Sequence, residues 1–237
     1  KDLVFFFNVG ITTNDFIGKE ILELCPGTGY NSLYLLKFTK IKHITLVDNN
    51  PSSIKELTKN LKKYKNKKII NKDIKKLILK KKYDYVIIEN ALLGFDNPNK
   101  IFKKICNFLK PGGCLVFTIS DEVGLFSEKL RFLYSRIVAH KNNLNNKSYS
   151  QKVKILTKVF KPHLAKLQAK TRTAEKWVQD MMLHYHMIQK EKYFSLLDLS
   201  KIVKEKRLII KGQTPDFNKD FQWYKKFEIK KYNHNII

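Results

Sequence analysis

Short apolar runs alternate with helical patterns along the first half of the chain. The runs are continuous, which is typical of strands covered on both faces of a sheet. Between them, apolar residues recur at helical spacing, most clearly at Leu57, Leu61 and Tyr64. Strands are predicted at residues 21–24, 43–47, 68–71, 83–90 and 114–119, and helices at 31–36, from 51 onward, at 74–79 and at 100–109. This alternation predicts an α/β fold built on a mostly parallel sheet.

The second half of the chain is mostly helical in pattern. Helical periodicity covers residues 122–140 and 151–192, and the Asn- and Lys-rich stretch at 141–150 predicts a mobile loop. The helical region is longer than a simple crossover, so we expect it to form a lid over the carboxyl edge of the sheet. Residues 208–212 and 227–232 predict a sixth and a seventh strand.

The N-terminal run at residues 3–7 predicts a strand, an extended arm or a plain packing segment. With the other elements it gives an α/β protein whose seven-stranded sheet has helices on both faces and a helical insertion. We therefore expect a core at 1–126, a lid at 127–200, and strands that complete the sheet at 201–237. The missing initiator Met leads us to expect further residues before Lys1.

Candidate chemistry begins where the first strand ends. Glu23 lies near the end of this strand, and a tight turn with Gly27 and Gly29 follows it. Glycine permits a sharp backbone bend and a close approach to a ligand. The helix behind the turn directs free N–H groups at the same place, which favours a phosphate or carboxylate. The pattern predicts a nucleotide-type site.

Two cofactor classes use this geometry, and one residue separates them. The dinucleotide fingerprint needs a third glycine where Ser32 stands. The stretch resembles instead motif I of the class I S-adenosylmethionine (SAM) methyltransferases, an acid followed by G-x-G-x-G. Cys25 occupies the place of the first glycine of that motif. Because a cysteine at positive φ is strained, we expect a slightly altered turn.

A second motif supports the resemblance. Residues 109–113 read Leu-Lys-Pro-Gly-Gly and resemble the L-x-P-G-G signature that precedes the fifth strand in this family. The resemblance covers residues 16–119 well and implies a Rossmann-like fold whose antiparallel seventh strand lies between the fifth and sixth. The runs at 172–180 and 215–225 resemble a small bacterial branch of the family whose substrates are unsettled.

The resemblance implies SAM as cofactor and a shell of residues at the strand ends. Asp48 takes the ribose hydroxyls, with a helix cap as the alternative. Asp73 receives the adenine amino group, again with a cap as the alternative. Glu89 meets SAM or a substrate amine. The expected cofactor-binding residues are Glu23, Cys25, Gly27, Gly29, Asp48, Asn49, Asp73 and Glu89.

Catalysis and acceptor binding are expected from the helical region and the C-terminal aromatic run. His163 is the first candidate for a general base, followed by His184 and His186; the alternative for His163 is a helix-start residue after Pro162. Substrate-binding candidates are Arg172, Trp223 and Tyr224, although Arg172 could instead pair with Asp180 or Glu175, and Trp177 could be core. His184 and His186 are two residues apart and cannot share a helix face, so no metal site is expected.

Charge and cysteines add less. The formal net charge is +26, but the basic residues are mostly Lys scattered over many segments, which favours a solvated surface over a nucleic-acid footprint. The three cysteines lie in apparent core elements and indicate a reduced, cytoplasmic protein. No segment has the length of a membrane span, and residues 1–10 do not resemble a signal peptide.

The sequence therefore predicts a SAM-dependent methyltransferase that acts on a hydroxyl or amine of a small, polar or anionic acceptor. An RNA methyltransferase is the alternative, supported by charge. Against this alternative, the chain has Glu89-Asn90 where many methyltransferases of base amines have an N/D-P-P-Y/F loop. A non-enzymatic partner protein with the same fold is a third possibility, supported only by Cys25.

Overall fold

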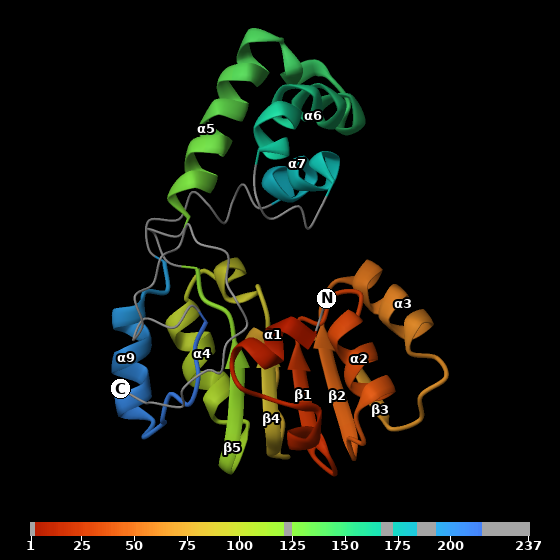
Figure 1. Ribbon diagram of the computed structural model, residues 1–237, viewed down its shortest axis with the longest axis vertical. Helices are drawn as coiled ribbons and strands as arrows, with labels where there is room; N and C mark the ends of the chain where they lie inside the picture. Colours follow the sequence, from red (N-terminus) through yellow and green to blue (C-terminus); the bar gives the residue numbers. More distant parts are fainter. Residues whose placement is uncertain (1–2, 121–124, 167–172, 184–192, 215–237) are drawn as a thin grey trace. The chain divides into compact units, whose positions relative to one another are not determined.

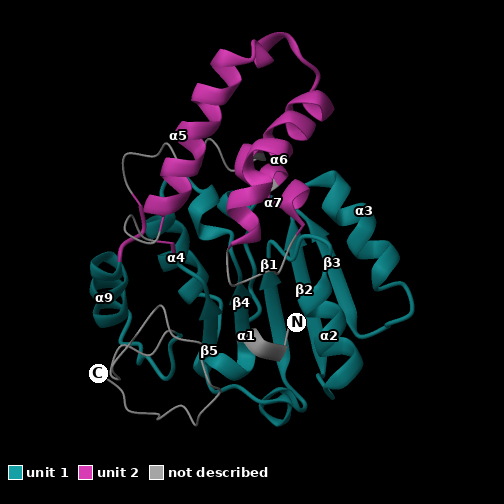
Figure 2. Cartoon of the chain, turned by 45° about the horizontal axis from the view of Figure 1, so that its top comes forward, with its two compact units in different colours: residues 1–119, 196–237 teal, residues 120–195 magenta. Residues whose placement is uncertain are grey.

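The computed structural model describes residues 3–120, 125–166, 173–183 and 193–214. The chain forms two compact units (Figure 2). The sheet unit comprises Lys1–Ile119 and Leu196–Ile237, and the helical unit comprises Ser120–Ser195. Each unit has its own hydrophobic core.

Five parallel strands form the sheet of the sheet unit (Figure 1). They are β1 Glu20–Leu24, β2 His43–Asp48, β3 Lys67–Asn71, β4 Tyr83–Ile88 and β5 Leu109–Phe117, in the order β3-β2-β1-β4-β5. The chain builds outward from β1 to β3 on one side and from β4 to β5 on the other. Ligands bind open α/β sheets at such a reversal, outside the carboxyl ends of the strands. The expected parallel α/β fold is confirmed.

Helices cover both faces of this sheet. Phe16 lies 4.7 Å from Tyr85, ring centroid to ring centroid, and Phe102 lies 4.8 Å from Phe117. Tyr85 pairs with Cys114, three residues before Phe117, so these two contacts are on opposite faces. The helical segments of this unit are α1 Leu3–Asn8, η1 Thr13–Phe16, α2 Tyr30–Phe38, α3 Pro51–Asn60, η2 Ile74–Lys76, η3 Leu92–Gly94, α4 Pro98–Cys106 and α9 Leu196–Glu205.

The expected sixth strand does not form. Residues 208–214 are described and contain no strand, so the described sheet has five strands instead of seven. Ile209 is 68% exposed, and a Cβ on Gly212 would overlap the Val9 carbonyl oxygen. This segment thus lies against the N-terminal segment, where it has no strand to pair with. The expected seventh strand, at 227–232, lies outside the described residues.

Two local predictions need correction. Residues 3–7 belong to α1, so a strand and an extended arm were wrong, whereas the packing segment is confirmed, because Phe6 of this helix is buried in the core against Phe16. Residues 74–79 form only the single 3-10 turn η2, which ends where Leu77 enters the core.

The Pro-Gly-Gly stretch lies within β5 instead of before it. Tyr83 pairs with Leu109, but Tyr85 pairs with Cys114, so β5 carries extra residues between the two pairs. Gly112 takes φ +72°, and a Cβ on Gly113 would lie 3.0 Å from the Tyr83 carbonyl oxygen. The glycines therefore make an irregular bulge at the start of the strand.

The helical unit contains α5 Phe126–Lys141, η4 Leu144–Asn146, α6 Tyr149–Ala165 and α7 Ala174–Leu183. Ser148 caps α6, because its Oγ accepts a hydrogen bond from the backbone N–H of Gln151. In return, the Gln151 side-chain Oε1 accepts from the backbone N–H of Ser148. The expected mobile loop at 141–150 is instead mostly ordered, because Leu144 is buried in the core of this unit. Within the described residues, no helix is long and apolar enough to span a membrane.

Candidate active site

The polar residues expected at the site follow β1, β2 and β4 at the carboxyl edge, where the parallel strands end. The turn at residues 25–29 follows β1, Asp48 ends β2, and Glu89 follows β4. The Cys25 amide donates to the Val47 carbonyl at 2.8 Å, which extends the β1–β2 ladder by one bond before the chain turns away.

Asp48 holds the turn to the neighbouring strand. Its Oδ2 accepts from the Gly27 amide at 3.2 Å, and its Oδ1 accepts from the Asn50 amide at 2.9 Å. The side chain is only 6% exposed. A carboxylate oxygen has two lone pairs, so each oxygen keeps the capacity for one more bond. Asn50, not Asp48, caps α3, because its side chain accepts from Ser52 and Ser53.

The two positions of the turn that carry glycine require it for different reasons. Both take positive φ, +56° at Gly27 and +79° at Gly29. A Cβ on Gly29 would overlap the Cδ1 methyl of Leu57, which is fully buried on α3. A Cβ on Gly27 would meet no protein atom within 4 Å. Gly29 is therefore needed for packing, whereas Gly27 leaves space in front of the backbone that a ligand can fill.

Cys25 takes a left-handed backbone conformation. Its φ is +54°, so the turn bears the strain of a Cβ in this region. Burial, together with the nearby charges of Asp48 and Asp73, raises the pKa of the Cys25 thiol to about 12. The thiol is therefore protonated and chemically unreactive at neutral pH.

Glu23 and Ser32 form a buried pair beneath the turn. Glu23 is 3% exposed and Ser32 is fully buried, and Ser32 Oγ donates to Glu23 Oε2. From the sequence pattern alone, Ser32 is only a missing glycine of the dinucleotide fingerprint. The pair fastens the first turn of α2 to β1. The signal that could have revealed it was an acid two residues before the turn and a hydroxyl three residues after it.

Glu89 is held in place by two asparagines. Asn31 Nδ2 donates to Glu89 Oε2 at 2.5 Å, and Asn90 Nδ2 donates to Oε1 at 3.3 Å. Asn90 has φ +53°, and its amide donates to Thr118 Oγ1 at 2.5 Å. The ends of β4 and β5 and the start of α2 are thus joined around one carboxylate. Nothing in the sequence pattern indicated Asn31, because its partner is 58 residues away.

The remaining expected cofactor residues, Asp73 and Asn49, lie at the ends of β3 and β2. Asp73 caps η2, since its Oδ1 accepts from the Lys75 amide at 2.7 Å. The alternative considered for Asp73, a helix cap, is therefore present in the structure. Asn49 is exposed between β2 and α3.

His163 belongs to a polar cluster in the helical unit. It lies in the last turn of α6, so the expectation that Pro162 starts a helix was wrong; the proline lies inside α6. His163 is exposed, and its Nε2 accepts from Arg131 Nε at 3.1 Å. Arg131 also forms an ion pair with Glu128 and lies 5.8 Å from the Trp177 ring centroid. This cluster joins α5, α6 and α7.

Several expected residues cannot be placed in this geometry. His184, His186, Arg172, Trp223 and Tyr224 lie outside the described residues. Among the residues that are described, no group of three His, Cys, Asp or Glu side chains could hold a metal ion.

Two curated proteins resemble parts of this chain. The malonyl-[acyl-carrier protein] O-methyltransferase of Priestia megaterium is 32% identical over 143 residues, which is 60% of this chain and 51% of the relative. The demethylmenaquinone methyltransferase of Leptospira interrogans is 35% identical over 106 residues, 42% of this chain and 43% of the relative. The chain thus spans about half the length of the curated relatives it matches.

Among solved structures, the N-methyltransferase NodS of Bradyrhizobium japonicum matches with a TM-score of 0.40 and 20% identity, over 43% of this chain and 52% of that one. A family model described as "Methyltransferase domain" matches residues 16–199, which include the glycine turn, the whole sheet and the helical unit. Because this family model covers most of the chain, the chain belongs to the class I SAM-dependent methyltransferases.

Proposed function

We propose that the protein transfers a methyl group from SAM to a hydroxyl or amine of a small acceptor. The observation that carries this proposal is the turn after β1, in which Asp48 binds the Gly27 amide and no protein atom fills the space before Gly27. A glycine with open space in front of it, next to an acid with spare acceptors, fits a ribose-bearing ligand.

Each polar group near the turn has a proposed part in cofactor binding. Asp48 accepts hydrogen bonds from the ribose diol, with Asn49 beside it, and Asp73 lies at the next strand end for the adenine amino group. Glu89, oriented by Asn31, offers a carboxylate to an ammonium group. Glu23 and Cys25 shape the turn from beneath. When bound, SAM supplies a methyl group already activated on a cationic sulfonium.

The chain itself contributes alignment and proton transfer. Placing the acceptor atom in line with the methyl group converts a bimolecular reaction into a nearly unimolecular one. A hydroxyl acceptor also needs a base. We keep His163 as the first candidate, with His184 next; His163 can accept a proton at Nε2 only after the bond from Arg131 is released. Glu89 is the candidate within the sheet unit.

The helical unit is proposed to bind the acceptor, with Arg172, Trp223 and Tyr224 contributing from outside the described residues. One face of α5 supports this role, because Phe126, Leu130, Leu133 and Ile137 are each between 46% and 61% exposed at helical spacing. The names of the two curated relatives specify malonyl-[acyl-carrier protein] and demethylmenaquinone. Neither acceptor is a nucleic acid, which favours a small acceptor group over RNA for this chain.

Two measurements test the proposal. Calorimetry should show SAM binding and no NAD binding; tight NAD binding without SAM binding would contradict it. A screen of hydroxyl and amine acceptors for release of S-adenosylhomocysteine should then identify the acceptor class. Transfer of labelled methyl groups to total RNA, but to no small acceptor, would favour the RNA alternative.

A further inference from the structure

The amino edge of the sheet, where the parallel strands begin, carries a row of lysines. Each strand has a lysine within two residues of its first residue. Following the strand order from β3 to β5, these are Lys65, Lys42, Lys19, Lys82 and Lys110. They are far apart in the sequence, which is why the lysines looked scattered there. The parallel topology gathers them at one edge.

The opposite edge has a different charge pattern. Within two residues of the strand ends, the chain carries the acids Glu23, Asp48, Asp73 and Glu89 and one lysine, Lys72. A general excess of lysine would place cations at both edges alike. Among the residues next to the strand ends, the positive charges are therefore concentrated on the edge away from the proposed cofactor site.

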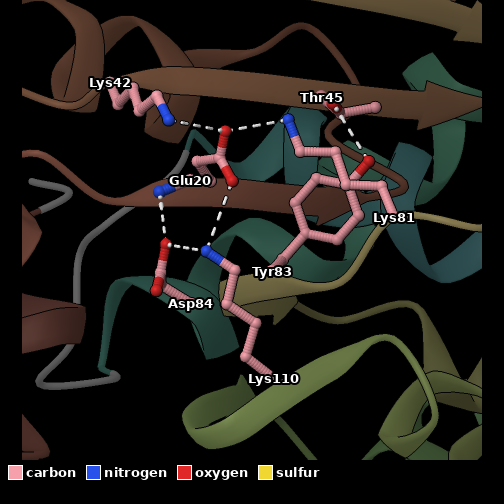
Figure 3. Close-up of polar contacts among 7 residues, drawn as sticks. All are labelled: Glu20, Lys42, Thr45, Lys81, Tyr83, Asp84 and Lys110. Atoms are coloured by element: carbon pink, nitrogen blue, oxygen red, sulfur yellow. Dashed lines mark hydrogen bonds and ion pairs between the residues drawn. The ribbon is translucent and has the colours of Figure 1, made fainter.

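Two acids organise part of the lysine row (Figure 3). Glu20 lies 3.4 Å from the Lys42 Nζ, 2.9 Å from Lys81 and 3.3 Å from Lys110, and Asp84 lies 3.0 Å from Lys110. These acids hold Lys42 and Lys110 of the row in place but do not neutralise it. Lys19, Lys65 and Lys82 remain exposed beside the cluster.

We infer that the amino edge is a docking surface for a nucleic-acid strand. Neighbouring strands are about 4.8 Å apart, so the row spans roughly 19 Å as a line of charges. A nucleic-acid strand also carries its charges in a line, about 3.4 Å apart in a duplex, whereas a bilayer presents a plane. Lysines contact phosphates as point charges without reading bases, so the binding is independent of sequence.

This inference does not rest on the proposed function. β-Strands of the usual five to six residues separate the two edges of the sheet by about 17 to 20 Å. A nucleic-acid strand docked at the amino edge therefore does not reach the proposed cofactor site through the same contacts. The surface would hold the protein on nucleic acid while the carboxyl edge remains available to its own ligands.

The test compares two triple variants of the full chain that each lose three positive charges. One removes Lys19, Lys65 and Lys82 at the amino edge by Lys→Gln changes. The matched control changes Lys55, Lys72 and Lys100, exposed lysines on α3, after β3 and on α4. Binding to a labelled 20-nucleotide oligouridylate is measured by fluorescence anisotropy over a range of salt concentrations.

We expect the amino-edge variant to bind the oligonucleotide at least tenfold more weakly than the control variant. Its slope of log affinity against log salt should be shallower by about 2, since each lost contact to a single strand removes about 0.7. Equal losses in both variants would overturn the inference, because they would indicate diffuse attraction. The inference would also be overturned if the unaltered protein bound poly-glutamate as tightly as the oligonucleotide, or bound phosphatidylglycerol vesicles more tightly than the oligonucleotide. SAM binding should be unchanged in both variants, which separates this result from the proposed function.

Discussion

Asp48 and Gly27 are joined by a hydrogen bond of 3.2 Å from the glycine amide to the carboxylate. The acid proposed to bind the cofactor thus also fixes the turn in front of which the cofactor would lie. Cofactor binding and the order of the turn therefore depend on the same side chain, so both SAM affinity and stability must be measured in a variant at this position.

Asp48→Ala should weaken SAM binding by roughly 10- to 100-fold, which corresponds to about 1.4 to 2.8 kcal/mol. It should also lower the free energy of unfolding by about 1 to 3 kcal/mol, because the hydrogen bonds from the Gly27 and Asn50 amides are lost and each contributes about 0.5 to 1.5 kcal/mol. Calorimetry and urea denaturation measure the two effects. Asp96→Ala, at a side chain 84% exposed, is the control and should change neither. Unaltered SAM affinity in Asp48→Ala would contradict the ribose role.

The glycines of the turn should respond differently to alanine. Gly29→Ala should destabilise the protein by about 2 kcal/mol or more, because the new Cβ overlaps buried Leu57 and φ is positive. Gly27→Ala should lower the free energy of unfolding by only about 1 kcal/mol, the cost of a Cβ at positive φ, yet it should weaken SAM binding.

Gly18→Ala supplies the matched control for Gly27, since Gly18 also has positive φ and open space in front of it. We expect the two variants to have similar melting temperatures and only Gly27→Ala to bind SAM poorly. If both bind SAM as the unaltered protein does, the space before Gly27 is not the cofactor site.

Cys25→Gly should stabilise the protein by about 0.5 kcal/mol. Relief of the left-handed strain gains about 1 to 2 kcal/mol, and the greater freedom of glycine in the unfolded chain offsets part of it. Cys25→Ala keeps the Cβ and should not be stabilised.

In the unaltered protein, iodoacetamide should modify Cys25 only slowly at pH 8, because burial raises the pKa of its thiol to about 12. Rapid labelling of the folded protein would contradict this assignment.

Acid should destabilise the sheet unit partly through Glu20. Lys81 and Lys110 lower the pKa of its carboxyl group to about 2, below the ordinary value of 4.5. A carboxyl whose pKa is lower in the folded state stabilises the protein above pH 4.5 and loses that contribution as pH falls towards 2. Urea denaturation between pH 2 and 6 should therefore show a steeper loss in the unaltered protein than in Glu20→Gln. Parallel curves would show that Glu20 has no part in acid sensitivity. Glu205→Gln, at an exposed pair with Lys103, is a surface comparison.

The sequence was sufficient for those features that local pattern determines. The apolar runs predicted β1 to β4 closely, and the spacing of Glu23, the glycines and Asp48 predicted which residues follow the strands at the carboxyl edge. Such signals are read within a few residues, and the parallel topology places the strand ends together.

Contacts between distant segments were not accessible in the same way. The bond from Asn31 to Glu89 and the burial of Ser32 against Glu23 depend on how α2 lies over the strand ends. An apolar run at 208–212 looked like a strand, but a strand also needs a neighbour to pair with. The lysine row is the clearest case, since each lysine is ordinary in its own segment and only the strand order aligns them.

The path of the chain between the two units has a consequence for synthesis. The chain leaves the sheet unit after Ile119 and returns at Leu196, where α9 packs on α4. All five strands are therefore synthesised before the helical unit, and α9 is synthesised only after it. Leu199 and Ile202 of α9 are buried, so a nascent chain that ends before residue 196 exposes the apolar surface they cover. We expect the sheet unit to wait for the helical unit during translation, and chaperones that bind exposed apolar surface to engage it in that interval.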